Sequence, residues 1–144
     1  MTEPAKAKIF LSDERGLQQE DKHRSYHTFN FGNYSNAHKI PFFNLHVVND
    51  ETLAGGHLLK TTIEESSYII LLPVVGAIYY NDSLGNENMI NAGELQIINL
   101  PWHESFELSN AYENDLVNFI QSSNYIFSGR TQLFQPDCKK DTEK

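Results

Sequence analysis

Seven short segments of this chain are rich in β-branched and aromatic residues or alternate apolar with polar residues, as strands do. They span residues 42–48, 57–63, 67–80, 88–90, 94–100, 105–109 and 116–121. Clusters of turn-forming residues such as NDETLAGG, NDSLGNEN and NAGE separate them. No segment carries the apolar stripe of about 3.6-residue period that an amphipathic helix of about 11 residues or more requires. The sequence therefore predicts an all-β sandwich or barrel with little helix.

The segment 67–80, SYIILLPVVGAIYY, is too long and too apolar for one flat strand. Pro73 cannot donate a ladder hydrogen bond and Gly76 lacks a side chain, so we expect a bend or bulge there, with two strands meeting. In the following NDSLGN, Asp82 and Gly85 suit a tight turn, because glycine adopts the positive φ that other residues resist. A hairpin is expected at this point.

The length and composition predict one globular domain. The chain has 144 residues, 40% of them hydrophobic, which suffices for a core without disulfides. We expect the domain to occupy residues 1–134 and the polar residues 135–144 to form a frayed tail. The single cysteine, Cys138, lies in this tail, so an internal disulfide or a cysteine-based zinc site is not expected.

The charge pattern argues against a nucleic-acid partner. The formal net charge is -8, whereas phosphate-backbone binding depends on clustered lysine and arginine. The first 16 residues contain only a short apolar run, with neither the apolar core of a signal peptide nor a membrane span. We therefore expect no membrane partner and a cytoplasmic location.

Two separated stretches resemble the pirin family. RSYHTFNFGNYSNAHKIPFFNLHVVND (24–50) is similar to the family's opening W-H-T-F-S-F-x-x-Y and the strand that ends R-V-I-N-D-D. DSLGNENMINAGELQI (82–97) is similar to its D-S-x-G-N, short strand and A-G-E/D-x-Q turn. The similarity runs from about Ile9 to Gln121. It implies a single cupin barrel, a double-stranded β-helix or jelly roll, that corresponds to the N-terminal half of the family's two-barrel proteins.

The same resemblance directs attention to a metal site. Family members hold a transition metal, commonly iron, through a His-Pro-His and a His-Ser-Glu group, and some open flavonols such as quercetin with dioxygen. These groups fall on residues 62–64 and 106–108, so the ligand positions are Thr62, Glu64, Phe106 and Leu108. Only Glu64 could bind a metal strongly, whereas a mononuclear site needs at least about three donors. No metal cofactor is therefore expected, and the four positions are a candidate small-molecule pocket.

An alternative is a metal site rebuilt from shifted positions. His57, Glu64 and His103, joined by Glu104, would form a two-histidine carboxylate set. Against it, the five-residue offset between His57 and Thr62 reverses the strand facing, and His103 belongs to a loop. Iron or another transition metal is expected only under this alternative.

The remaining histidines are interpreted structurally. His27 is expected to order the N-terminal segment through a hydrogen bond, and His46 to be a surface or hydrogen-bonded residue. His23 and His38 are expected in polar loops. No nucleophile elbow, phosphate loop or convergent carboxylate pair is found in the sequence.

Two functions of different class follow. The first is a metal-free pirin-like cupin with a non-enzymatic binding or regulatory role, whose partner is a small apolar ligand or another protein. The second is a metal-dependent dioxygenase of the quercetin type. Because the two barrels of the family's proteins cover each other's apolar faces, a single barrel is expected to pair with itself as a homodimer. Segments 68–80 and 124–134 are the candidate surfaces, and strand exchange through 124–134 stays open.

Overall fold

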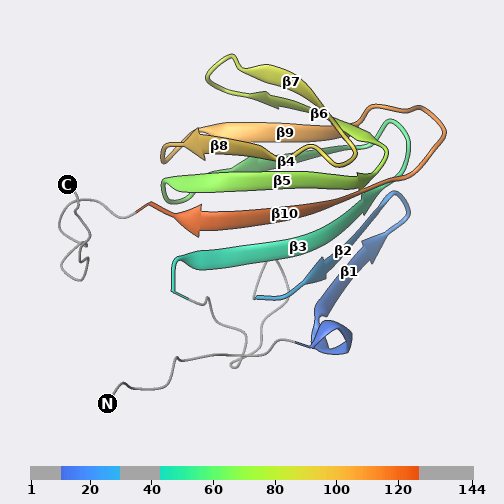
Figure 1. Ribbon diagram of the computed structural model, residues 1–144, viewed down its shortest axis with the longest axis horizontal. Helices are drawn as coiled ribbons and strands as arrows, with labels where there is room; N and C mark the ends of the chain where they lie inside the picture. Colours follow the sequence, from blue (N-terminus) through green and yellow to red (C-terminus); the bar gives the residue numbers. More distant parts are fainter. Residues whose placement is uncertain (1–10, 30–42, 127–144) are drawn as a thin grey trace.

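The computed structural model describes residues 11–29 and 43–126 (Figure 1). The predicted tail 135–144 with Cys138, the loop histidine His38, and residues 127–134 of the second candidate surface lie outside these ranges.

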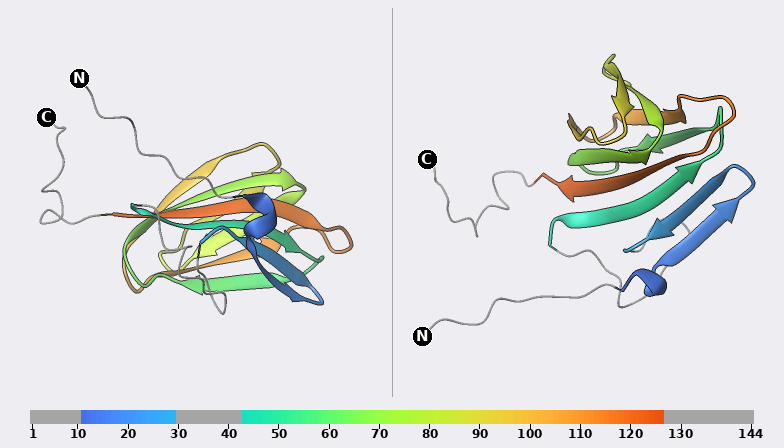
Figure 2. Two further views of the ribbon diagram at one scale, coloured as in Figure 1. Left: turned by 90° about the horizontal axis from the view of Figure 1, so that it is seen from below. Right: turned by 45° about the vertical axis from the view of Figure 1, so that its right-hand side comes forward.

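The described residues form ten strands in two antiparallel sheets, with a single 3-10 turn, Ser12–Glu14, as their only helical element. The larger sheet has the order β1-β2-β3-β10-β5-β8, and the smaller sheet the order β4-β9-β6-β7. The strands are β1 (Gly16–Glu20), β2 (His23–His27), β3 (Leu45–Leu53), β4 (Leu58–Thr62), β5 (Ser67–Val75), β6 (Ala77–Asp82), β7 (Glu87–Asn91), β8 (Gln96–Leu100), β9 (Ser105–Asn110) and β10 (Val117–Tyr125). The predicted all-β class is confirmed, and Figure 2 shows the smaller sheet lying over part of the larger one while the β1–β2 hairpin extends beyond it.

The predicted break in the segment 67–80 is where the chain changes sheets. β5 belongs to the larger sheet and β6 to the smaller one, and Gly76 joins them with a φ of 82°. The positive φ favours glycine at this position, and a Cβ atom on Gly76 would also make a tight contact of 3.2 Å with the Val117 side chain. Beside Pro73 the pairing of β5 with β10 shifts register, which confirms the predicted bulge.

The predicted turn between β6 and β7 is organised by Asp82. Its carboxylate accepts hydrogen bonds from the backbone N–H groups of Leu84 and Asn86, both at 3.0 Å. Burial opposes ionisation, but these hydrogen bonds and that from the Tyr80 hydroxyl outweigh it and lower the pKa of Asp82. Gly85 completes the turn with a φ of 93°.

There are two errors in the sequence predictions at the N-terminal side, one omission and one wrong assignment. The hairpin β1–β2 was not predicted, and residues 49–53, interpreted as part of a turn, continue β3 to Leu53. Both errors have one cause: the inward positions of these strands include Ser25, Asn49 and Glu51, so polar rather than apolar residues alternate into the interior. A pattern search for buried apolar residues passes over such strands.

The interior has two parts. The apolar cluster gathers side chains from both sheets: Leu53, Ile63, Ile69, Leu71, Ile78, Tyr80, Ile90, Leu100, Phe106, Leu108, Val117 and Phe119. The polar wall is formed by inward residues of β2, β3 and β10, each no more than 5% exposed: Ser25, His27, Asn49, Glu51, Gln121 and Ser123. The two parts meet along β10, where Gln121 lies opposite Leu71 of β5 and Asn49 of β3.

No helix in the described part of the chain is long and apolar enough to cross a membrane.

Candidate ligand-binding site

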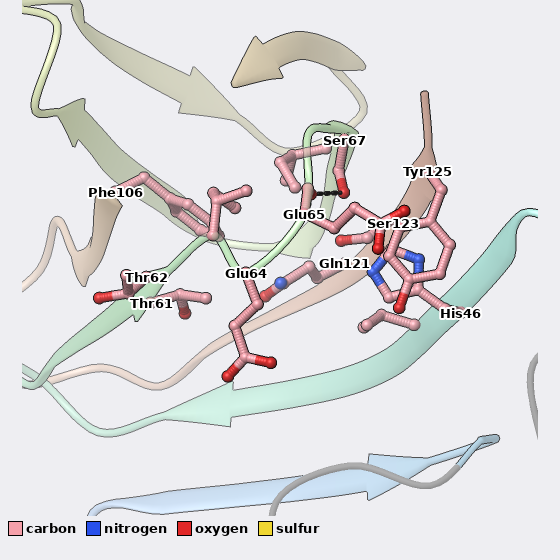
Figure 3. A pocket seen from close by; sticks show the side chains of 13 residues that line it. His46, Thr61, Thr62, Glu64, Glu65, Ser67, Phe106, Gln121, Ser123 and Tyr125 are labelled. Carbon is pink, nitrogen blue, oxygen red and sulfur yellow. Dashed lines mark hydrogen bonds between the residues drawn. The ribbon is translucent and has the colours of Figure 1, made fainter. Parts of the chain in front are cut away.

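A pocket of about 450 Å³ opens between the two sheets where the polar wall ends. β3, β4, β5, β9 and β10 contribute its walls, together with the β4–β5 turn (Figure 3). Its lining comprises His46, Val47, Thr61, Thr62, Ile63, Glu64, Glu65, Ser67, Ile69, Phe106, Gln121, Ser123 and Tyr125. This volume is in the usual range for small-molecule sites, about 300–1,000 Å³.

The four positions predicted from the family resemblance divide between surface and core. Thr62 and Glu64 are exposed at the pocket, while Phe106 and Leu108 are each 1% exposed. Phe106 also lines the pocket and lies 6.0 Å from the ring of Tyr80, whereas Leu108 belongs to the apolar cluster and does not line it. The structure thus brings three of the four predicted residues to one cavity.

The residues at these positions do not fit a transition metal. Phe106 and Leu108 have no donor atom, and the Thr62 hydroxyl is a weak ligand compared with an imidazole. Within residues 11–29 and 43–126, no group of three or more histidine, cysteine, aspartate or glutamate side chains could hold a metal ion. Of the four positions, only Glu64 contributes a carboxylate to the pocket.

The structure does not bring the alternative ligand set together. His57 lies just before the first residue of β4, and its carbonyl oxygen accepts a hydrogen bond from the backbone N–H of Asn110. His103 lies near the last residue of β4, where its backbone N–H donates to the carbonyl oxygen of Ile63. Since a strand rises about 3.3 Å per residue, these ends are separated by about 13 Å. The exposed His103 has a φ of 77°, and its ring stacks on Trp102 at 3.6 Å.

An aromatic pair forms one wall of the pocket. The rings of His46 and Tyr125 are parallel, with centroids 3.6 Å apart. Burial lowers the pKa of His46, partly offset by the carbonyl of Asn44 and the charge of Glu65. His46 is half-buried, and its Nδ1 atom lies 3.4 Å from the carbonyl oxygen of Asn44. Of the two states predicted for His46, exposed or hydrogen-bonded, the hydrogen-bonded one is confirmed.

Two other histidines are part of, or next to, the polar wall. The Nδ1 atom of His27 lies 3.0 Å from Oδ1 of Asn49, which confirms that a hydrogen bond orders this histidine. His23 was predicted to lie in a loop, but it begins β2, and its Nε2 lies 2.6 Å from Oε1 of Glu51. The prediction of a loop for His23 is therefore wrong. It missed the strand because the partner, Glu51, is buried in a part of β3 that was interpreted from the sequence as a turn.

The sequence reasoning missed the residues that form the polar side of the pocket. Gln121 and Ser123 point inward from β10 and are 5% and 4% exposed. In the sequence VNFIQSSNY they look like the solvent side of an edge strand. The available signal was the spacing, because Val117, Phe119, Gln121 and Ser123 share one face at a period of two.

The chain is similar in sequence to curated proteins over part of its length. No protein-family model matches the chain. It is 32% identical over 87 residues to quercetin 2,3-dioxygenase of Escherichia coli strain K12, covering 60% of this chain and 38% of that protein. A Pasteurella multocida relative that carries the same name provisionally is 31% identical over 93 residues, covering 63% and 40%. The chain therefore spans about two fifths of the length of the curated relatives it matches.

Solved structures show the same fold. The crystal structure of YhhW from Escherichia coli superimposes with a TM-score of 0.73 at 23% identity, covering 83% of this chain and 51% of that one. The nickel(II) complex of this bacterial pirin gives 0.70 at 24% identity, with 81% and 51% covered. The cupin domain of Cnp3 from Schizosaccharomyces pombe gives 0.53 at 10% identity, with 79% and 71% covered. The described residues thus have the fold of these structures, a single cupin β-barrel of the jelly-roll type.

Proposed function

We propose that this pirin-like cupin is a non-enzymatic binding protein that works in the cytoplasm, without a metal centre, through its barrel pocket. The observation that carries the proposal is the burial of Phe106 and Leu108 at positions where the resemblance places metal ligands. Burying each such side chain stabilises a fold by roughly 1.5 to 3 kcal/mol, so the site has exchanged coordination for packing. A pocket of about 450 Å³ still borders Phe106, which leaves room for an organic ligand.

The metal content of the purified protein tests this proposal. After incubation with excess iron(II), nickel(II), copper(II) or zinc(II) and desalting, we expect elemental analysis to find each metal well below one ion per chain. The double variant Phe106→His, Leu108→Glu returns two donors to the same strand and is the matched comparison. A stoichiometric metal in the unmodified protein, lost on substituting a lining residue such as Glu64, would contradict the proposal.

A second candidate function is quercetin-type dioxygenation, which the names of the two curated relatives favour. It requires His57, Glu64 and His103 to converge, although His57 and His103 lie at opposite ends of β4. Oxygen consumption with quercetin is the direct measurement. Activity that is abolished by a chelator and by His57→Ala would establish this candidate in place of the first.

We also propose that the protein forms a homodimer through the outer face of β5 and β8. Within the described residues this face carries Tyr68, Val74, Val75, Leu95 and Ile97, each between 44% and 59% exposed. In register, Ile97 lies beside Ile70, so the apolar residues continue across both strands. β8 is also an edge of the larger sheet, where exposed backbone groups favour pairing with another copy.

Light scattering at micromolar concentration tests the dimer. We expect twice the chain mass for the unmodified protein and a monomer for Ile97→Lys. Leu84→Lys, which changes an equally exposed leucine in the β6–β7 turn, should remain a dimer. A monomeric unmodified protein would remove this part of the proposal without affecting the pocket.

A further inference from the structure

Two side chains of the pocket are nearly buried, and their polar groups have no hydrogen-bond partner among residues 11–29 and 43–126. Gln121 and Ser123 are 5% and 4% exposed, and among the residues described in the structure neither side chain has a hydrogen-bond partner. Figure 3 shows the amide of Gln121 extending from β10 toward the middle of the pocket. Neither side chain contributes a fully enclosed unpaired atom, so the polar groups of Gln121 and Ser123 are open to the cavity. There they are available to hydrogen-bond a ligand, as the few polar groups of a small-molecule site are.

The charge around the pocket has one sign. Among the described residues that line it, Glu64 and Glu65 are the only formally charged side chains, and none of these residues is a lysine or arginine. Their field reaches across the cavity, because both carboxylates add to the effect of burial in raising the pKa of Tyr125. Lys60, the nearest cation along β4, is exposed and does not line the pocket.

The opposite side of the cavity is apolar and aromatic. Val47, Ile69 and Phe106 contribute buried carbon surface, and the stacked rings of His46 and Tyr125 form a flat wall. Figure 3 shows these two rings overlapping beside Ser123. A ligand body that fits here has apolar surface of its own, since apolar contact is the main source of affinity in such sites.

We propose that this pocket binds a small organic cation, a protonated amine carried on a short apolar or aromatic body. The inference rests on the proposed binding function and narrows its ligand class. An ammonium group donates hydrogen bonds, and the pocket offers acceptors in the carbonyl oxygen of Gln121 and the hydroxyl of Ser123. Its charge would face Glu64 and Glu65, whereas a carboxylate or phosphate ligand would meet like charge and, in the described part of the lining, no basic side chain.

Three probes of nearly the same shape test this proposal on the full chain: 2-phenylethylamine, 2-phenylethanol and 3-phenylpropionate. Two-dimensional NMR titration reports the dissociation constant and, through the side-chain amide of Gln121, the place of binding. We expect the amine to bind about fivefold more tightly than the alcohol and the acid to bind most weakly. The advantage of the amine should fall at high salt, because the carboxylates are exposed.

Variants separate the contributions. Glu64→Gln with Glu65→Gln should reduce the amine to the affinity of the alcohol and leave the alcohol unchanged. Glu113→Gln, an exposed glutamate outside the pocket, is the matched control and should change neither. Gln121→Leu should weaken all three probes, with the dispersion of its spectrum showing that the barrel still folds.

Different outcomes test the preference for a cation and the binding function separately. If the alcohol or the acid binds at the pocket as tightly as the amine, the preference for a cation is overturned and the binding function stands. If no probe shifts the pocket resonances, the cation proposal is overturned and the binding function loses its support from this cavity. If the amine shifts only resonances far from Gln121, the site is elsewhere and the proposal is wrong.

Discussion

The apolar cluster and the polar wall share one barrel interior, but they differ in the kind of side chain that they bury. In the apolar cluster, Phe106, Leu108 and their neighbours bury carbon surface away from water, which stabilises the folded state. In the polar wall, Glu51 is 3% exposed, and its Oε1 atom lies 2.6 Å from Nε2 of His23. The side chain of Gln121 has no hydrogen-bond partner in the described part of the protein. One region therefore buries almost only carbon, and the other holds polar groups that depend on specific partners or remain open to the pocket.

The border between the regions follows one strand. Along the inner face of β10, Val117 and Phe119 belong to the cluster, and Gln121 and Ser123 to the wall. The change from apolar to polar occurs within two residues and coincides with the pocket. Placing unsatisfied polar groups at a cavity is the arrangement expected when function and stability compete in one fold.

The largest expected effect is in the cluster. Phe106→Ala should lower the free energy of unfolding by about 4 kcal/mol, because it removes buried carbon and leaves a cavity. Urea unfolding measures it, with Trp102→Ala, 58% exposed, as the control that should change it by about 0.5 kcal/mol or less. A loss as small as the control's would mean that this side of the interior is not a packed core.

The next effect is in the wall. Glu51→Ala should lower the free energy of unfolding by about 3 kcal/mol, since it deprives His23 of its buried partner. Glu51→Gln keeps an oxygen acceptor at nearly the same volume and should be milder. Equal losses in the two variants, measured by urea unfolding, would show that packing rather than the pairing with His23 matters at this position.

A polar-wall variant at Gln121 is expected to increase the free energy of unfolding, by less than the two losses above. Gln121→Leu should raise the free energy of unfolding by about 1 kcal/mol, because a nearly buried amide with no partner among the described residues is replaced by carbon. Its neighbour across the ladder provides the reciprocal variant, Leu71→Gln, which should destabilise the protein. If Gln121→Leu destabilises the barrel as well, the polar wall contributes to stability as the apolar cluster does, and the two regions do not differ in this respect.

The smallest effect depends on pH. Burial lowers the pKa of His46 below its ordinary value of 6.5, so between the folded and unfolded pKa values the unfolded chain binds more protons. Stability should therefore rise with pH through this window and level off above about pH 6.5. His46→Gln should show a shallower rise when urea unfolding is compared across pH 5 to 8, and an unchanged slope would contradict the assignment.

Much of the fold was predictable from local chemistry. Alternation and turn residues were enough for the all-β class, and Pro73 with Gly76 marked the place where the chain changes sheets. Asp82 and Gly85 marked the hairpin, because turn geometry depends on neighbours in sequence. The hairpin β1–β2 and the second half of β3 were missed, since their inward residues are polar.

The site was only partly within reach of the sequence. Thr62, Glu64 and Phe106 were named and lie at one pocket, yet the residues that complete it, among them His46, Gln121 and Tyr125, come from strands far apart in the chain. Whether a glutamine on a strand faces water or a buried cavity depends on which strands cover it. The sequence by itself determined the periodicity and the turns, because these are interactions between near neighbours. Only the tertiary structure decided which polar side chains are buried together, because that depends on the pairing of β10 with β3 and β5.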